Sequence, residues 1–285
     1  MADRPTTATL RRAIDDAVAE LDAAGIESPR WDAEQLASHV LDVSRSGLLT
    51  ADLDGAAAER FRQLVAQRAA RVPLQHLVGS VGFRYVELAV GPGVFTPRPE
   101  TELVAGAAID AARATSAPIV VDLCTGSGAI ARSVVDEVPD AVVHAVELDA
   151  DAVAWARRNL DGTSATLHHA DAAEALPELD GRVDVVVCNP PYVATHELLL
   201  VPPEVRDHDP HVALVADHDG LAVIRAVARS AARLLRAGGT FVVEHSDRQG
   251  VAVPALLAEQ GCWRDIADHR DLTGRDRYAT AVRKG

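Results

Sequence analysis

The residues VVVCNPPYVA, at positions 185–194, begin as an apolar strand and end in a corner that cannot continue one. Two consecutive prolines remove backbone N–H donors and stiffen the chain, so the strand is expected to end at Cys188. The side-chain oxygen of Asn189 and the backbone carbonyl of Pro190 are two hydrogen-bond acceptors in this rigid corner, and Tyr192 adds an aromatic face. Such a set suits a planar NH2 group held by both of its hydrogens.

Methyl transfer to a planar amide or aromatic amino group is difficult because the nitrogen lone pair is delocalised. Acceptors that hold the NH2 hydrogens aim the nitrogen at an electrophilic methyl group and stabilise the positive charge that develops on it. No metal and no strong base are required, because the proton can leave after the transfer. We therefore predict that Asn189, Pro190 and Tyr192 are catalytic, and that Pro191 completes the substrate-binding corner.

A second motif, VVDLCTGSGAIA at 120–131, is an apolar strand followed by a glycine turn and a helix. Gly126 and Gly128 let the backbone turn sharply and leave room for a ligand at the helix N-terminus. Glu147, about 20 residues further on, could accept hydrogen bonds from ribose hydroxyls, and Asp171 could meet an adenine edge. A single strand-end acid is as readily a helix cap, but three such features on successive strand ends favour a nucleoside ligand.

The glycines alone are compatible with either NAD or S-adenosylmethionine, since Ala131 fits the last position of the dinucleotide pattern. The Asn-Pro-Pro-Tyr corner opens on the same crevice and favours S-adenosylmethionine, because a held NH2 group needs a methyl donor. The residues that the motifs themselves assign to that cofactor are Gly126, Gly128, Glu147 and Asp171.

The surrounding pattern predicts a helical region, a linker and an α/β domain. Apolar residues recur at helical spacing in 6–24, from Ser28 and Pro29 onward as N-cap and first turn, and in 56–71, so residues 1–77 are expected to form a small helical bundle. Alternating apolar residues and glycines predict a β-hairpin linker over 78–97. From residue 98 to 285, helices are expected to alternate with apolar runs at 118–123, 142–148, 165–170, 183–188, 241–245, 262–269 and 277–283. This order predicts a doubly wound, parallel seven-stranded sheet with an antiparallel end.

The composition limits the partners. Hydrophobic residues make up 48% and charged residues 25% of the 285 positions, as in an ordinary folded domain. The N-terminus has no signal-peptide pattern and no apolar run has the length of a membrane span, so we expect a cytoplasmic protein without a membrane partner. A net charge of -14 without a basic stripe argues against free nucleic acid. The three cysteines have no paired spacing and are expected to be reduced structural thiols.

Two other segments invite a function and are predicted to have none. DHDPHVALVADHD, at 207–219, holds His208, His211 and His218 with several aspartates, but it lacks the H-x-x-x-H pair of a helical metal site. We therefore expect a solvated loop and no metal. RDLTGRDR, at 270–277, is predicted to be a turn with paired surface charges that contribute little.

The chain resembles the PrmC/HemK family of protein-(glutamine-N5) methyltransferases over nearly its whole length. Asn-Pro-Pro-Tyr is shared with adenine and cytosine amino-methyltransferases, so the PRPETE block and the helical front end are the more specific signs. The blocks that carry the resemblance, beside the two motifs above, are VPLQHLVGSVGF (72–83), VGPGVFTPRPETE (90–102), EVRDHDPHVAL (204–214), DGLAVIR (219–225), LRAGGTFVVEHSDRQG (235–250) and DLTGRDRYATAVR (271–283).

The resemblance implies a Rossmann-like methyltransferase domain that binds S-adenosyl-L-methionine and releases S-adenosyl-L-homocysteine. It implies that 124–128 and Glu147 hold the cofactor, that Asp171 and Ala172 flank the adenine, and that 189–192 hold a substrate glutamine. The full set of residues expected to bind the cofactor is then Asp122, Cys124, Thr125, Gly126, Ser127, Gly128, Glu147, Leu148, Asp171, Ala172 and Asn189. That glutamine belongs to the Gly-Gly-Gln loop of class 1 peptide chain release factors, whose methylation modulates translation termination. The N-terminal bundle is then expected to grip the release factor, with the enzyme acting as a monomer.

Some features stay open. Arg98 and Glu100 either shape a lid over the acceptor site and bind substrate, or mark a plain helix start. Cys124 replaces a glycine that is common in the family, and Ala172 replaces an aromatic residue of some members. The main alternative function is an exocyclic amino-methyltransferase acting on adenine in DNA or RNA. A non-catalytic cofactor-binding protein and an NAD dehydrogenase are further alternatives.

Overall fold

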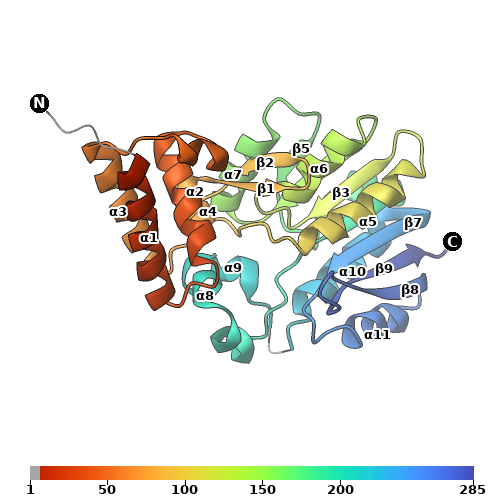
Figure 1. The fold of residues 1–285 in the computed structure, drawn as a ribbon. Helices are drawn as coiled ribbons and strands as arrows, with labels where there is room; N and C mark the ends of the chain where they lie inside the picture. Colours follow the sequence, from red (N-terminus) through yellow and green to blue (C-terminus); the bar gives the residue numbers. More distant parts are fainter. Residues whose placement is uncertain (1–6, 218) are drawn as a thin grey trace, which may run out of the picture. The chain divides into compact units, whose positions relative to one another are not determined.

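The computed structural model describes residues 7–217 and 219–285. It separates into two compact units, which we describe one at a time. The first unit contains the chain up to residue 80 together with Pro202–His208, and the second contains Val81–Val201 and Asp209–Gly285. Figure 1 labels the elements of both. No helix in the described ranges is both long and apolar enough to cross a membrane.

The first unit is helical, as predicted. Its elements are α1 (Thr7–Ala23), α2 (Pro29–Leu41), the 3-10 helix η1 (Arg45–Leu49), α3 (Gly55–Ala69), α4 (Leu74–Val78) and α8 (Pro203–His208). The three longest helices bury Leu21, Leu36 and Phe61 in one apolar cluster. Ser28 precedes α2, but its side chain makes no capping hydrogen bond, whereas Asp54 caps α3 through the backbone nitrogen of Ala57.

Charged side chains attach the distant segment α8 to this unit. Nε of Arg68, on α3, lies 2.7 Å from Oδ2 of the buried Asp32 on α2. Arg68 and Arg71 also bind Oε1 of Glu204, at 3.2 and 2.9 Å. Glu204 is partly buried and binds two guanidinium groups, so these pairs help to explain why α8 packs with helices that lie far from it in sequence.

The second unit is an α/β sandwich with a hairpin. Its elements are β1 (Ser80–Phe83), β2 (Val86–Ala89), α5 (Thr101–Arg113), β3 (Ile119–Leu123), α6 (Ala129–Glu137), β4 (Val142–Glu147), α7 (Ala150–Leu160), β5 (Thr166–His169), η2 (Pro177–Leu179), β6 (Val183–Cys188), η3 (Thr195–Leu200), α9 (His211–Leu214), α10 (Ala222–Leu234), β7 (Leu235–Glu244), α11 (Ala252–Glu259), β8 (Trp263–Arg270) and β9 (Asp276–Arg283).

The seven-stranded sheet has the order β5-β4-β3-β6-β7-β9-β8, with β9 antiparallel to both of its neighbours. This confirms the predicted parallel sheet with an antiparallel end. Strand β7 begins at Leu235, earlier than the predicted 241, because Gly238, with φ 79°, and Gly239 remain within the strand. After β3 the chain adds β4 and β5 on one side of this strand, and it then adds β6 and β7 on the other side. Ligands of open α/β sheets bind where the strand order reverses in this way.

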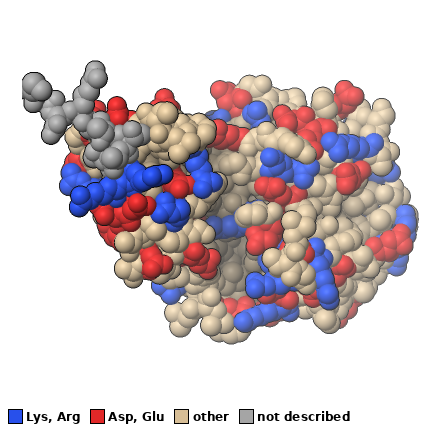
Figure 2. Space-filling view, in the orientation of Figure 1, with Lys and Arg blue, Asp and Glu red and all other residues tan. Residues whose placement is uncertain are grey.

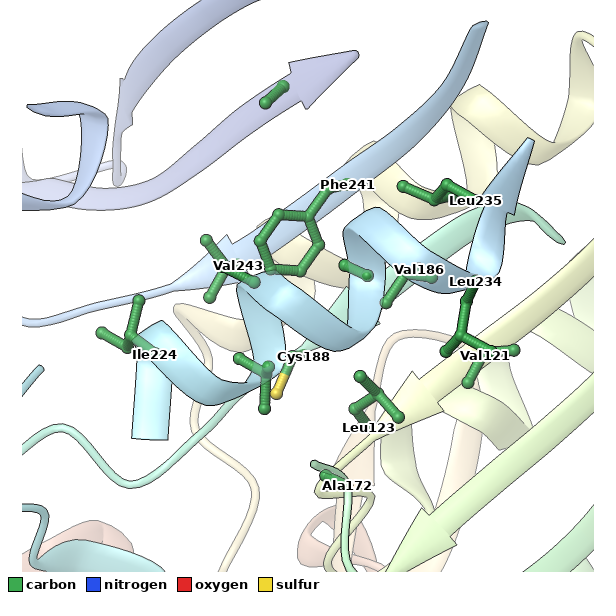
Figure 3. Close-up of a cluster of buried hydrophobic side chains, with 14 of the residues drawn as sticks. Val121, Leu123, Ala172, Val186, Cys188, Ile224, Leu234, Leu235, Phe241 and Val243 are labelled. Carbon is green, nitrogen blue, oxygen red and sulfur yellow. The ribbon is translucent and has the colours of Figure 1, made fainter. Parts of the chain in front are cut away.

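Each face of the sheet is covered by helices, because successive strand residues point to opposite faces. Figure 3 shows Ile224 and Leu234 of α10 beside Phe241 and Val243 of β7, in the cluster that also receives α11. The opposite face packs against α5, α6 and the hairpin, which contributes the buried Phe83. The carboxyl ends of the central strands are therefore held between two packed layers.

The segment 207–219 is not the predicted solvated loop. It contains the end of α8 and all of α9, and Asp209 is buried with an ion pair to Arg98 at 2.6 Å. His218 lies outside the described residues. Within the described ranges, no group of three His, Cys, Asp or Glu side chains is arranged to hold a metal.

Candidate active site

The turn after β3 is built from residues in the left-handed region of φ and ψ. Gly126 and Gly128 have φ of 58° and 85°, and Cys124 has φ of 60°, which is costly for a residue with a side chain. A Cβ atom on Gly126 would meet no atom within 4 Å. The backbone of the turn is thus open toward the carboxyl-end crevice, as a ligand that approaches the main chain requires.

Asp122 supports this turn from behind. It is fully buried, and its Oδ2 accepts hydrogen bonds from the Thr125 hydroxyl and from the backbone nitrogen of Ala131. Burial raises the pKa of Asp122 to about 7, although these two hydrogen bonds lower it. Asp122, predicted as a cofactor residue, therefore contacts the turn itself.

Glu147 ties the end of β4 to the same turn. Its Oε2 accepts from the backbone nitrogen of Gly126 at 2.8 Å, and its Oε1 accepts from those of Leu148 and Asp149, both at 2.9 Å. A carboxylate oxygen can accept more than one hydrogen bond, so Oε2 keeps capacity for a ligand hydroxyl.

The carboxyl ends of β3, β4, β5 and β6, which carry the predicted site residues, lie at the same edge of the sheet. Leu123 pairs in register with Cys188, and Glu147 pairs with His169. Asp171, just after β5, is exposed, and its Oδ1 accepts from the backbone nitrogen of Ala173 at 2.8 Å. The glycine turn, the two acids and the Asn-Pro-Pro-Tyr corner therefore end at one edge of the sheet. Leu148 is 55% exposed and Ala172 is buried.

The Asn-Pro-Pro-Tyr corner is stabilised by contacts with its backbone that were not predicted from the sequence. Val193 forms an isolated parallel bridge with Val215, just after α9. The side-chain nitrogen Nε2 of Gln249 donates to the carbonyls of Tyr192 and Gly220, at 3.3 and 3.2 Å. Gly220, with φ 70°, approaches so closely that a Cβ there would lie 2.5 Å from the Tyr192 carbonyl oxygen. The motif DGLAVIR thus supplies a close-packing glycine to the corner.

The side chains of the corner are connected to two polar residues of other elements. Nδ2 of Asn189 donates to Oγ1 of Thr101, the first residue of α5, at 3.2 Å. The hydroxyl of Tyr192 donates to Oε1 of Glu244, the last residue of β7, at 3.1 Å. Neither Thr101 nor Glu244 was among the predicted site residues, although both lie inside the blocks PRPETE and FVVEH.

Glu244 is 1% exposed, and its Oε2 is buried without a hydrogen bond of good geometry among the described residues. Burial raises the pKa of Glu244 to about 7, while the Thr101 hydroxyl as a donor, the charge of Arg277 and the Tyr192 hydroxyl lower it. Burial of its hydroxyl, together with the nearby Glu244, raises the pKa of Tyr192 above its ordinary value. Tyr192 therefore keeps its proton and acts as a donor.

The prediction of weak surface charges for RDLTGRDR was wrong. Asp271 is 7% exposed, and its Oδ1 accepts from the Thr273 hydroxyl at 2.6 Å. Its Oδ2 lies 3.1 Å from the guanidinium of Arg277, whose side chain is 13% exposed. The hydrogen bond from Thr273 leads the contacts that hold the pKa of Asp271 well below its usual range. The turn thus positions a partly buried cation whose charge acts on Glu244.

Arg98 and Glu100 are placed at the start of α5. Arg98 forms the ion pair with Asp209 and lies over the ring of Phe95, 5.0 Å from its centroid. Glu100 occupies the N-cap position of α5, and its side chain makes no capping hydrogen bond. Its negative charge contributes to the raised pKa of Glu244.

The sheet order, the open glycine turn and the acceptor corner together define a methyltransferase of the nucleoside-binding α/β type. Two family descriptions match the chain: the PrmC N-terminal domain over residues 12–79 and the methyltransferase small domain over 88–201. A 16S rRNA methyltransferase of T. thermophilus, RsmC, solved with AdoMet and guanosine, shares the fold with a TM-score of 0.53 and 24% identity, covering 72% of this chain and 50% of that one.

Full-length relatives identify the family. The chain is 53% identical over 273 residues to a release factor glutamine methyltransferase of Streptomyces coelicolor, covering 94% of this chain and 96% of the relative. It is 42% identical over 282 residues to the 4-amino-L-phenylalanine/4-methylamino-L-phenylalanine methyltransferase of Streptomyces pristinaespiralis, covering 96% and 95%. The chain belongs to the release factor glutamine methyltransferase family.

Proposed function

We propose that this protein transfers a methyl group from S-adenosyl-L-methionine to the side-chain nitrogen of the glutamine in the Gly-Gly-Gln loop of class 1 release factors. The observation that carries the proposal is the orientation of Asn189, whose Nδ2 is already used by Thr101 at 3.2 Å. Its Oδ1 is therefore the atom left to accept a hydrogen bond from a substrate NH2 group. The identity of 53% over 94% of the chain supports the choice of acceptor.

The cofactor would be held at the ends of β3, β4 and β5. The open backbone of the glycine turn at 124–128 suits its close approach, and Glu147 has acceptor capacity for the ribose hydroxyls. Asp171 and Ala172 would flank the adenine, with Leu148 beside them. The bound cofactor supplies an electrophilic methyl group on a sulfonium, which needs no metal or redox step.

The acceptor glutamine would be held at 189–192. Its two amide hydrogens are donated to Oδ1 of Asn189 and to the backbone carbonyl of Pro190, and its plane packs on the Tyr192 ring. The glutamine nitrogen, held in this way, would attack the methyl carbon that a bound cofactor would supply, and the electron pair of the broken carbon–sulfur bond would stay on sulfur. The nitrogen finally loses one of its protons to water, which restores a neutral amide.

The helical unit is proposed to bind the release factor, and the domain roles follow the predicted division at 1–77, 78–97 and 98–285. Figure 2 shows basic side chains gathered over α1 and α3, with acidic side chains beside them. Such a mixed surface suits a folded protein partner better than a uniform polyanion. Arg98 and Glu100 are proposed to shape the edge of the acceptor site.

A small aromatic amine is the second candidate acceptor, because one full-length relative at 42% identity is named for 4-amino-L-phenylalanine. An aromatic amino group presents the same two hydrogens as a primary amide. A transfer assay with labelled S-adenosylmethionine should compare a release factor, free 4-amino-L-phenylalanine, and adenine-containing DNA and RNA. Label on the release factor alone supports the proposal, and faster transfer to the amino acid or to nucleic acid would replace it.

A further inference from the structure

Glu244 has no part in the methyl transfer described above, although its carboxyl group contacts Tyr192 of the acceptor corner. It ends β7, the strand next to β6, which leads into the Asn-Pro-Pro-Tyr corner. Its carboxyl group is 1% exposed and accepts the hydroxyl proton of Tyr192 at 3.1 Å. Since desolvating a carboxylate is costly, an apolar residue would be the cheaper choice at this position unless the charge has a use.

The direction of each hydrogen bond around Glu244 can be deduced. An amide nitrogen only donates, so Nδ2 of Asn189 is the donor and Oγ1 of Thr101 is the acceptor in their contact at 3.2 Å. The single proton of the Thr101 hydroxyl is then free for another acceptor. A hydrogen bond from the Thr101 hydroxyl lowers the pKa of Glu244, so we infer that this proton is directed at the Glu244 carboxylate. With that step, the hydrogen bonds from Asn189 through Thr101 and from Tyr192 both lead toward Glu244.

We propose that ionised Glu244 is a positioning residue that orients Asn189 through the Thr101 hydroxyl and holds the Tyr192 ring through its own hydroxyl. This inference rests on the proposed function, since it assigns the group that keeps the acceptor oxygen Oδ1 of Asn189 facing the substrate amide. If the direction of these hydrogen bonds were reversed, Thr101 would donate to Oδ1 of Asn189. The Asn189 amide would then turn its NH2 group toward the NH2 group of the substrate. Two donors would then face each other.

The direction of the hydrogen bonds among Asn189, Thr101 and Glu244 depends on the charge of Glu244. A protonated carboxyl group can donate to Thr101, which releases the constraint on Asn189. The charged groups that face Glu244 are Arg277, which favours ionisation, and Glu100, which opposes it, beside the Tyr192 hydroxyl. His245, the next residue along the chain, is paired with Asp268 at 2.8 Å. Catalysis is therefore expected to rise with pH as Glu244 ionises, around a pH of about 7.

Kinetics of four variants test the inference. Glu244→Gln keeps the size but offers an NH2 donor, and Thr101→Val removes the hydroxyl at equal volume. Each is expected to lower kcat by about 10- to 100-fold, with the KM for S-adenosylmethionine within about threefold of wild type. Thr101→Ser restores the hydroxyl and is expected to rescue most of the loss. Glu259→Gln removes one exposed negative charge from α11 and serves as the matched control.

The pH profile separates positioning from mere support of the fold. The kcat of wild type should rise through a pH of about 7, and this rise should be absent in Glu244→Gln. A wild-type kcat and profile in both Glu244→Gln and Thr101→Val would overturn the inference. Equal loss of kcat at every pH in Glu244→Gln, with a profile still rising as in wild type, would also overturn it.

A readout without substrate keeps this inference distinct from the proposed function. In protein labelled with 15N-asparagine, the side-chain NH2 signal of Asn189, assigned by its loss in Asn189→Asp, should shift with pH near 7. The shift should vanish in Thr101→Val and in Glu244→Gln. An Asn189 signal independent of pH and of both substitutions would refute the positioning role. Failure of wild type to methylate a release factor would instead refute only the proposed acceptor.

Discussion

The carboxylate of Glu147 accepts a hydrogen bond from the backbone nitrogen of Gly126 at 2.8 Å, so the last residue of β4 holds the turn that follows β3. The same carboxylate is the one expected to accept the ribose hydroxyls of the cofactor. One side chain would therefore both shape the site and bind the ligand. Its removal should weaken cofactor binding through both effects.

Glu147→Gln tests this double role. A glutamine cannot accept on both sides, so in either orientation its side-chain NH2 group would face a backbone N–H group that Glu147 now accepts. We expect the Kd for S-adenosylhomocysteine, measured by calorimetry, to rise at least about tenfold, the effect of losing one charge-assisted hydrogen bond. The surface variant Glu259→Gln should bind as wild type. An unchanged Kd in Glu147→Gln would refute the assignment of Glu147 to the cofactor.

Gly220→Ala tests the bracing of the acceptor corner. The added Cβ would lie 2.5 Å from the Tyr192 carbonyl oxygen and 2.7 Å from Nε2 of Gln249, at a φ of 70°. We expect a loss of about 1–3 kcal/mol in the free energy of unfolding, together with a lower kcat because the corner must shift.

Gly162→Ala is the matched control for that variant. Gly162 has the same φ of 70°, but nothing lies within 4 Å of its added Cβ. Both variants carry the backbone strain, and only Gly220→Ala carries the clash. Urea unfolding and methyl-transfer assays should show a larger stability loss and a kcat defect only at 220. Equal behaviour of the two variants would mean that the close approach of Gly220 does not matter.

Cys124 has a backbone conformation that favours glycine, because its φ is 60°. Cys124→Gly and Cys124→Ala both remove the thiol, and only the first relieves the left-handed backbone. We expect the glycine variant to be more stable than the alanine variant by about 0.5–1 kcal/mol, after the entropy cost of glycine is subtracted. Chemical denaturation of the pair would show this, and a more stable alanine variant would contradict it.

Burial of Glu244 makes stability depend on pH. Its pKa is raised from 4.5 to about 7 in the folded protein, so the folded state binds more protons than the unfolded state between these values. Stability from this group is therefore complete at low pH and is lost as pH rises from about 5 to 8. The pKa of Asp122 is raised to about 7 by burial and adds to the same trend.

Glu244→Gln removes one of these two contributions. The free energy of unfolding of the variant, relative to wild type, should increase between pH 5 and 8 by at most about 3 kcal/mol. The variant would then gain relative stability at the pH where it loses activity, as expected of a charge kept for function. Parallel stability curves for the two proteins over this range would show that Glu244 is not the titrating group.

Much of the fold follows from local patterns. The strands near 120, 145 and 185 are short apolar runs bounded by glycine or proline, so their ends could be predicted to within a residue or two. The start of β7 was missed because Gly238 and Gly239 normally end a strand, whereas here they lie within it. The short helices α8 and α9 were missed because contacts with distant residues, such as Arg68 with Glu204, stabilise them.

The site residues also fall into those that local sequence motifs predict and those that only the fold brings together. The glycine turn, Glu147 and the Asn-Pro-Pro-Tyr corner are motifs of adjacent residues, and each reveals its chemistry by type and spacing. The supporting residues Thr101 and Glu244 are separated from Asn189 by many residues, and only the pairing of β6 with β7 and the packing of α5 bring them together. The sequence points to Glu244 in one way, as an acid at the end of the apolar run 241–243.

The most direct measurement of the central claim is mass spectrometry of a release factor after reaction with this protein and S-adenosylmethionine. A single added methyl group, 14 Da by its chemical composition, should map to the glutamine of the Gly-Gly-Gln loop, and Asn189→Ala should abolish it. The result that would contradict the account is methylation that maps to another residue, or methylation that persists when that glutamine is replaced.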